Sequence, residues 1–177
     1  MPLVQYCFRR SVLEQERCYS IDEDRLVIEG AGAAPRVIPL NDIRAVHLKY
    51  EHTKQREYYE CHVHTGGGRV SLRHVHWQGF REFQDRRLVY TPFVKALLAQ
   101  LAGRSNVTFK AGSAANFIGA IVGIPVMSTL GVIALWMQRY GYAALAGFFT
   151  TLCIAMIGPS RPRAFDPLAP PADLLPE

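Results

Sequence analysis

The chain has 177 residues, a formal net charge of +5 and a charged fraction of 20%, a length that suits one domain of about 100–150 residues with a smaller addition. The charged fraction and the 11% of aromatic residues argue against disorder. The four cysteines form no CxxC pair, which argues against a disulfide scaffold and a zinc ribbon. Between residues 111 and 159 the one fully charged side chain is Arg139, and this asymmetry indicates a membrane protein.

The N-terminal part has the pattern of a soluble β-rich domain. No long apolar core precedes Arg9 and Arg10, so we expect no signal peptide. Residues 11–75 alternate short apolar runs with turn signals, the first being the acidic Asp22-Glu23-Asp24. The predicted strands are 17–21, 26–28, 36–40 and 43–50.

Residues 58–65 and 69–76 form the clearest predicted hairpin, around the three glycines at 66–68. An even register places His64 opposite Arg69 and Val63 opposite Val70, because a slip of one residue would put the apolar side chains on opposite faces. We therefore expect one core face and one solvated basic face. The core face is Tyr59, Cys61, Val63, Val70 and Leu72, and the basic face is His62, His64, Arg69, Ser71 and Arg73.

An amphipathic helix is predicted to close this domain. Thr91 and Pro92 suit the N-cap and the first helical position. Five apolar residues then recur at helical spacing and predict a buried stripe. They are Phe93, Val94, Leu97, Leu98 and Leu101. We expect a domain over 1–103 and a linker over 104–113.

Two apolar segments follow, at 114–137 and 142–157, and predict a transmembrane helical hairpin over 114–157. The second segment is slightly short for a span. Small residues spaced by four suit close helix packing, within the hairpin or between copies of it. They are Ala115, Gly119 and Gly123 in the first segment and Ala143 and Gly147 in the second. Neither segment contains an acidic residue, lysine or histidine, which ranks a transporter low.

Basic residues set the expected orientation of the hairpin. Lysine and arginine flank the outer ends of the two segments, whereas only Arg139 lies in the turn. The positive-inside rule then places both termini in the cytoplasm. Cys7, Cys18 and Cys61 would be reduced thiols there.

Residues 158–177 form a proline-rich tail that cannot continue a helix. Its apolar residues are unusual for a pure linker. We consider two interpretations: a disordered end, or an extended segment that docks on the domain or on a partner. The docking residues would be Phe165, Leu168, Leu174 and Leu175.

The stretch IDEDRLVIEG at 21–30 and the stretch RVIPLNDIRAVHL at 36–48 resemble the opening strands of bacterial pleckstrin-homology-like (PH-like) domains. The resemblance covers roughly residues 5–103. It implies an α+β fold, in which an antiparallel PH-like β-barrel or sandwich with a C-terminal capping helix precedes the two-helix transmembrane hairpin. Eukaryotic PH domains that bind phosphoinositides carry basic residues at the first hairpin turn, whereas the turn assigned here is acidic, so lipid binding is not carried over.

Candidate chemistry in the sequence is sparse. His62, His64, His74 and His76 suggest a zinc site, but the hairpin register separates them, so we predict no metal ligands. We find no nucleophile motif and no phosphate-binding loop. We therefore expect neither catalytic residues nor a cofactor.

The basic residues remain as the predicted contact surface: His62, His64, Arg69, Arg73, Arg86 and Arg87. The sequence leads us to expect a non-catalytic scaffold or accessory subunit of the bacterial inner membrane. It would cross the membrane twice and bind membrane lipids and a protein partner at the cytoplasmic face, with no nucleic acid and an undetermined oligomeric state. The alternatives are a module that senses anionic lipids and, third, a metal-dependent enzyme that uses the histidines.

Overall fold

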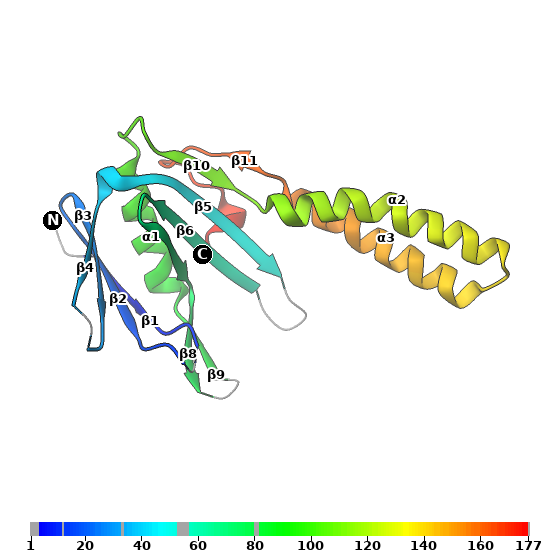
Figure 1. Cartoon of the computed structure of the whole chain (residues 1–177), viewed down its shortest axis with the longest axis horizontal. Helices are drawn as coiled ribbons and strands as arrows, with labels where there is room; N and C mark the ends of the chain where they lie inside the picture. The colour runs from blue at the N-terminus through cyan, green and yellow to red at the C-terminus, as the bar shows by residue number, and fades with distance from the viewer. Residues whose placement is uncertain (1–3, 12, 33, 53–56, 80–81, 177) are drawn as a thin grey trace. The chain divides into compact units, whose positions relative to one another are not determined.

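The computed structural model describes residues 4–176 except 12, 33, 53–56 and 80–81. The fold is α+β, with eleven strands and three α-helices among the described residues (Figure 1). The chain divides into two compact units. One consists of Met1–Ala111 with Ala164–Glu177, and the other is Gly112–Arg163.

An antiparallel four-stranded sheet opens the first unit, in the order β1-β2-β3-β4. Its strands are β1 (Val4–Phe8), β2 (Arg17–Asp22), β3 (Arg25–Gly30) and β4 (Arg36–Pro39). The acidic turn joins β2 to β3, and Glu23 there has a φ of 44°. Strand β1 was not predicted, although Tyr6 and Phe8 are buried and alternate with more exposed neighbours. The first hairpin is therefore β1–β2, one strand earlier than expected.

A five-stranded sheet follows, in the order β11-β10-β5-β6-β7. Its strands are β5 (Ile43–His52), β6 (Glu57–Thr65), β7 (Gly68–Arg73), β10 (Thr108–Ala111) and β11 (Arg163–Ala164). Strand β10 pairs in parallel with β5, with Phe109 opposite Val46. The prediction that 104–113 is only a linker is thus wrong, because Val107 and Ala111 are buried in the core.

The predicted register of the β6–β7 hairpin is confirmed. His64 lies opposite Arg69 and Val63 lies opposite Val70. Cys61, Val63 and Leu72 are fully buried, as the core face requires. The second predicted strand ends early, at Arg73, and the chain then forms a separate hairpin of β8 (Val75–Gly79) and β9 (Glu82–Asp85).

Helix α1 (Arg87–Leu101) carries the predicted apolar stripe, and all five stripe residues are fully buried. Its predicted start at Thr91 is wrong, because the helix begins four residues earlier and has Pro92 inside it. The Asp85 carboxylate accepts a hydrogen bond from the Arg87 amide at 3.0 Å, which satisfies one free donor of the first turn. Pro92 removes one helical hydrogen bond.

The C-terminal tail belongs to the first unit. Leu174 and Leu175 are 1% and 4% exposed within the core, beside the short 3-10 helix η2 (Ala172–Leu174). The ring of Phe165 packs edge-on against Phe109, with centroids 5.8 Å apart. Leu168 is 71% exposed, so it does not belong to the core.

The second unit is a helical hairpin of α2 (Ala114–Trp136) and α3 (Tyr140–Ser160). Ser113 caps α2 by accepting a hydrogen bond from the Asn116 amide. Both helices are long and apolar enough to cross a membrane, over Asn116–Trp136 and Tyr140–Gly158. Helix α3 starts two residues before the predicted 142 and continues past 157, so it is not short.

Small residues bring α2 and α3 together at fewer positions than predicted. A Cβ at Gly123 would lie 2.9 Å from Cys153 Sγ, and Ala143 is half-buried. Gly119 and Gly147 have nothing within 4 Å of a Cβ position, so the structure places them away from the helix contact. The side chain of Ala115 lies outside the described residues.

Cys7 and Cys18 are opposite each other on β1 and β2, and a disulfide joins them. The structure thus differs from the expectation that both are free thiols. The pairing was not predicted because, without β1, nothing in the pattern placed these two cysteines side by side. Cys61 is free and fully buried, and burial raises the pKa of its thiol to about 12.

Candidate anion-binding site

The structure divides the predicted contact surface into separate places. His62, His64, Arg69 and Arg73 lie on the outer side of β6 and β7. Arg86 precedes α1 and Arg87 is its first residue. Arg87 pairs with Asp85 at 2.7 Å, so it is a local helix-end contact and not part of the same surface.

His62 is buried and not solvated as expected, with 4% of its surface exposed. Its Nε2 lies 3.2 Å from Glu60 Oε2, and Arg73 pairs with the other oxygen of the same carboxylate. Burial alone would raise the pKa of Glu60, but the hydrogen bond from His62 and the Arg73 charge lower it overall. Arg73 and His62 thus both hold the Glu60 carboxylate, and Arg73 neutralises its charge.

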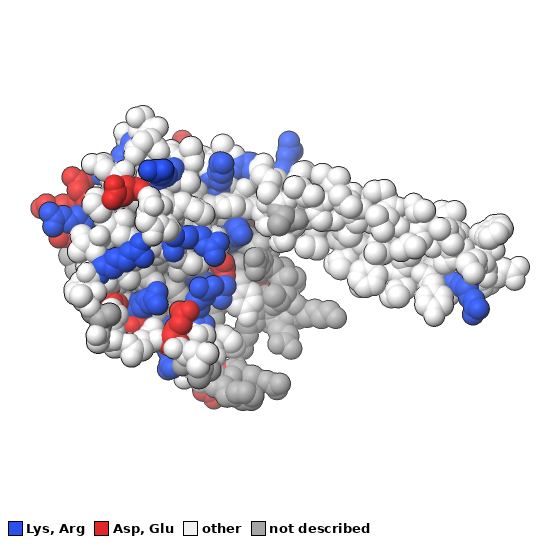
Figure 2. Space-filling view, viewed as in Figure 1, with Lys and Arg blue, Asp and Glu red and all other residues white. Residues whose placement is uncertain are grey.

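Lysines from neighbouring strands extend this surface. Lys49 of β5 lies opposite Glu60, and Lys110 of β10 lies opposite His47 of β5, which is itself opposite His62. Figure 2 shows lysine and arginine side chains gathered over the front of the domain, with few acidic ones among them. We call this surface the basic sheet face and define it as Lys49, His62, His64, Arg69, Arg73 and Lys110.

A cavity of about 120 Å³ lies beside this face, between the β1–β2 loop and β7. Arg10 contributes from the loop, Arg17 from the first position of β2 and Arg69 from β7. None of the three makes an ion pair with a carboxylate among the residues described. The remaining lining is Phe8, Glu14, Gln15, Tyr19 and Ser71. We call this pocket the arginine cavity.

The floor of the arginine cavity is rigid and contains an unused polar atom. Phe8 and Tyr19 are each 3% exposed and their rings stack, with centroids 5.5 Å apart. The Ser71 hydroxyl is buried and has no hydrogen-bond partner among the described residues. An unpaired buried hydroxyl is costly, so a ligand that accepts or donates a hydrogen bond there would gain free energy.

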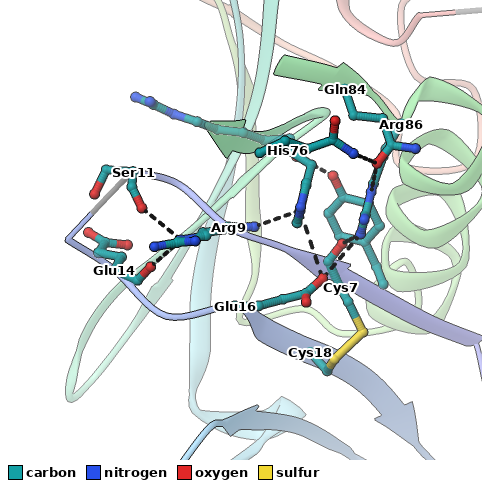
Figure 3. Close-up of polar contacts among 12 residues, drawn as sticks. Cys7, Arg9, Ser11, Glu14, Glu16, Cys18, His76, Gln84 and Arg86 are labelled. Carbon is teal, nitrogen blue, oxygen red and sulfur yellow. Dashed lines mark hydrogen bonds and ion pairs between the residues drawn. A yellow bond between two sulfur atoms is a disulfide. The ribbon is translucent and has the colours of Figure 1, made fainter. Parts of the chain in front are cut away.

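The β1–β2 loop, which carries Arg10 and leads to Arg17 at the start of β2, is shaped by the side chain of Arg9 (Figure 3). Arg9 Nε donates to the backbone oxygens of Ser11 and Glu14, at 3.1 and 2.8 Å. The Arg9 guanidinium also lies 5.1 Å from the ring centroid of Trp77. Arg9 thus turns inward and fixes the loop, while Arg10 remains exposed.

Arg86 holds the same loop from the other side (Figure 3). Its Nη1 donates to the backbone oxygen of Cys7 and lies 3.4 Å from Glu16 Oε1. His76 Nδ1 accepts a hydrogen bond from the Arg9 amide at 3.1 Å. Arg86 and His76 therefore position the loop, a role that the sequence alone did not indicate because β1 was missed.

The four histidines are not brought to one point. His74 is 2% exposed and its Nδ1 accepts a hydrogen bond from the Tyr59 amide, while His62 and His64 lie on the opposite side of the sheet. Within the described part of the chain, no three histidine, cysteine, aspartate or glutamate side chains are placed to hold a metal ion.

Arg10 and Arg17 are the site residues that sequence reasoning overlooked. The signal was present, since arginines at 9, 10 and 17 flank a polar segment, but it carries meaning only when β1 and β2 are recognised as a hairpin. In comparisons with known proteins, no family model, curated protein or solved structure matches the chain.

Proposed function

We propose that the protein is a membrane-anchored PH-like module that binds the phosphate of anionic lipid headgroups in the arginine cavity. The observation that carries this proposal is that Arg10, Arg17 and Arg69 line one cavity with the Ser71 hydroxyl, which has no hydrogen-bond partner in the described part of the chain. One guanidinium group can donate two parallel hydrogen bonds to two oxygens of the same phosphate, which a lysine ammonium group cannot do.

The size and charge of the cavity support a small anionic group. Its volume of about 120 Å³ is several times the roughly 10–15 Å³ that one water requires. Glu14 is the one carboxylate among its lining residues, against three arginines. An anion therefore meets a net positive site with a buried floor.

Helices α2 and α3 support the anchoring role. Residues 112–113 join β10 to α2, and 161–162 join α3 to β11, so two short connections tie the domain to the proposed spans. A domain tied in this way stays near the headgroups, where each basic residue contributes on the order of 1 kcal/mol.

The resemblance to PH-like domains supports the same site once the first hairpin is reassigned. The hairpin turn next to the arginines is the β1–β2 loop, and the acidic Asp22-Glu23-Asp24 turn belongs to the following hairpin. A four-stranded antiparallel sheet, a three-stranded meander and a final helix support the PH-like assignment. The acidic turn thus no longer argues against lipid binding.

The test measures phosphate binding by the full chain in nanodiscs of neutral phosphatidylcholine. Glycerol phosphate is titrated calorimetrically into the unmodified protein and into Arg17→Gln/Arg69→Gln. We expect an affinity loss of about tenfold or more in the double variant, since each arginine contributes on the order of 1 kcal/mol. Arg25→Gln/Lys95→Gln removes the same charge from exposed positions on β3 and α1 and should bind normally.

A second arm identifies the source of the phosphate. Nanodiscs containing phosphatidylglycerol should slow amide exchange at Arg10 and Ser71 relative to neutral nanodiscs, and the double variant should abolish this difference. Binding of glycerol phosphate without any effect of lipid composition would assign the cavity to a soluble phosphate compound. Absence of both effects would reject the function.

A further inference from the structure

The basic sheet face is a second charged surface with its own geometry. Lys110, Lys49 and Arg69 come from β10, β5 and β7, so their backbone positions are fixed by sheet hydrogen bonds. From β10 to β7 there are three strand spacings, about 14 Å. The sheet thus holds these cations in a rigid lattice of fixed spacing. Cations on a loop could instead adjust to a fluid layer of lipid headgroups.

The charge of this face is not balanced from within. Three rows of paired residues cross this part of the sheet, and they begin at Thr108, Lys110 and Lys49 and end at Arg69, Ser71 and Arg73, in that order. Glu60 is the one acidic residue in these three rows. It is 5% exposed and already bound by Arg73 and His62. Lys49, Arg69 and Lys110 pair with no carboxylate among the described residues.

The titration of His64 reports the same imbalance. Its pKa is lowered first by burial and then by the positive charges of His62, Arg69, Lys49 and Lys110. No acidic group is among the causes of the shift. The surface around His64 is therefore a region of uncompensated positive potential.

We propose that the basic sheet face docks an extended acidic segment of a partner protein, with carboxylates on every second residue. In an extended chain, alternate side chains lie on one face about 7 Å apart, so three of them span about 14 Å and match the width of the lattice. This role goes beyond headgroup binding, because Lys49 and Lys110 are not in the arginine cavity.

The experiment uses the full chain in neutral phosphatidylcholine nanodiscs and a fluorescent peptide with glutamate at alternate positions. A peptide with glutamine in place of glutamate shows the contribution of charge. We expect Lys49→Glu/Lys110→Glu to weaken glutamate-peptide binding at least about tenfold. The matched control, Arg25→Glu/Lys95→Glu, changes the net charge equally at exposed positions away from the face and should stay within about twofold. Thermal unfolding checks that both variants are folded.

Equal weakening by the two double variants would overturn the proposal, because net charge alone would then explain binding. Equal binding of the glutamate and glutamine peptides would also overturn it. If Lys49→Glu/Lys110→Glu instead reduced the response to phosphatidylglycerol and left peptide binding intact, the face would be a lipid surface and the proposal would fail. Arg69 belongs to both surfaces, so Arg10→Gln/Arg17→Gln, which leaves the basic sheet face intact, serves separately for the arginine cavity. The two proposals can therefore fail independently.

Discussion

The hydroxyl of Thr91 donates a hydrogen bond to the backbone oxygen of Pro176, 2.6 Å away. The fifth residue of α1 therefore contacts the end of the tail, at a position where the sequence predicted a helix cap. Immediately before this contact, Leu174 and Leu175 are buried in the domain core. The tail thus completes the domain from which it is separated in sequence by the helical hairpin.

Leu174→Ala should destabilise the domain by about 2–5 kcal/mol, because it removes a buried side chain and leaves a cavity. Leu168→Ala is the matched control, since Leu168 is 71% exposed, and should change the free energy of unfolding by less than about 0.5 kcal/mol. Denaturant unfolding of the full chain in detergent measures both. Equal stability of the two variants would show that the tail does not contribute to the core.

Periodicity predicted the parts of the fold in which one face is buried and the pattern is long. The β6–β7 register and the α1 stripe follow from residues such as Val63, Val70 and Leu97, which must all face one core. Strand β1 has only Tyr6 and Phe8 as fully buried positions, too few to distinguish a strand from a terminal segment. Strand β10 is short, and its pairing with β5 is long-range, so local pattern does not reveal it.

The candidate site was only half predictable for the same reason. Arg69 and Arg73 were assigned to one face because they belong to a recognised hairpin. Arg10 and Arg17 line the same cavity as Arg69, an arrangement that depends on β1. The alternation of apolar and polar residues did not predict the burial of Glu60 and His62. Alternation assigns a residue to one face of the sheet, but it does not tell whether long neighbouring side chains cover that residue.

Gly112 should be intolerant of any side chain. Its φ is +87°, and a Cβ there would overlap the backbone oxygen of Arg161. The adjacent Ser113 amide donates to the Ser160 oxygen at 3.0 Å, so the two connecting segments cannot separate freely. Gly112→Ala should cost at least about 1–2 kcal/mol from the left-handed backbone alone. Gly119→Ala, with open space at its Cβ position, should not lower the melting temperature in detergent.

Stability should decrease as the pH falls below about 6.5, largely through His74. Burial lowers the pKa of His74. The contact of its Nδ1 with the Tyr59 backbone oxygen and the charges of Asp85 and Glu57 oppose this lowering, and the Arg87 charge adds to it. A folded-state pKa below the unfolded value means that the unfolded chain binds more protons, so acid favours unfolding. His64 and His76 have lowered pKa values and act in the same direction.

His74→Asn keeps a hydrogen-bond acceptor but does not titrate in this range. The melting temperature of the full chain in detergent, compared at pH values of about 7.5 and 5.5, should therefore fall less for His74→Asn than for the unmodified protein. An unchanged pH dependence would assign the effect to His64 and His76. The lowered pKa of Glu60 acts separately, since its stabilisation is lost only as the pH falls below about 4.5.

The Cys7–Cys18 disulfide should stabilise the segment that carries two arginines of the candidate site. The bond closes a loop with a sequence separation of 11, and this loop carries Arg10 and Arg17. A cross-link over such a loop stabilises by about 3 kcal/mol in the chain-entropy description. Cys7→Ser/Cys18→Ser should therefore lower the free energy of unfolding by about that amount under oxidising conditions. Cys153→Ser, which changes a free cysteine on α3, is the control.

The same cysteines test the proposed topology, because the cytoplasm keeps thiols reduced. We propose from the distribution of lysine and arginine that the domain faces the cytoplasm. Rapid alkylation of intact cells should then trap Cys7 and Cys18 as thiols, and the disulfide seen in the structure should form only in the isolated, oxidised protein. A cysteine introduced as Gln138→Cys, in the turn between α2 and α3, should react with a membrane-impermeant maleimide from outside, whereas Ser105→Cys should not. A disulfide already present in alkylated cells, together with labelling of Ser105→Cys, would place the domain in an oxidising compartment and reverse the assigned orientation.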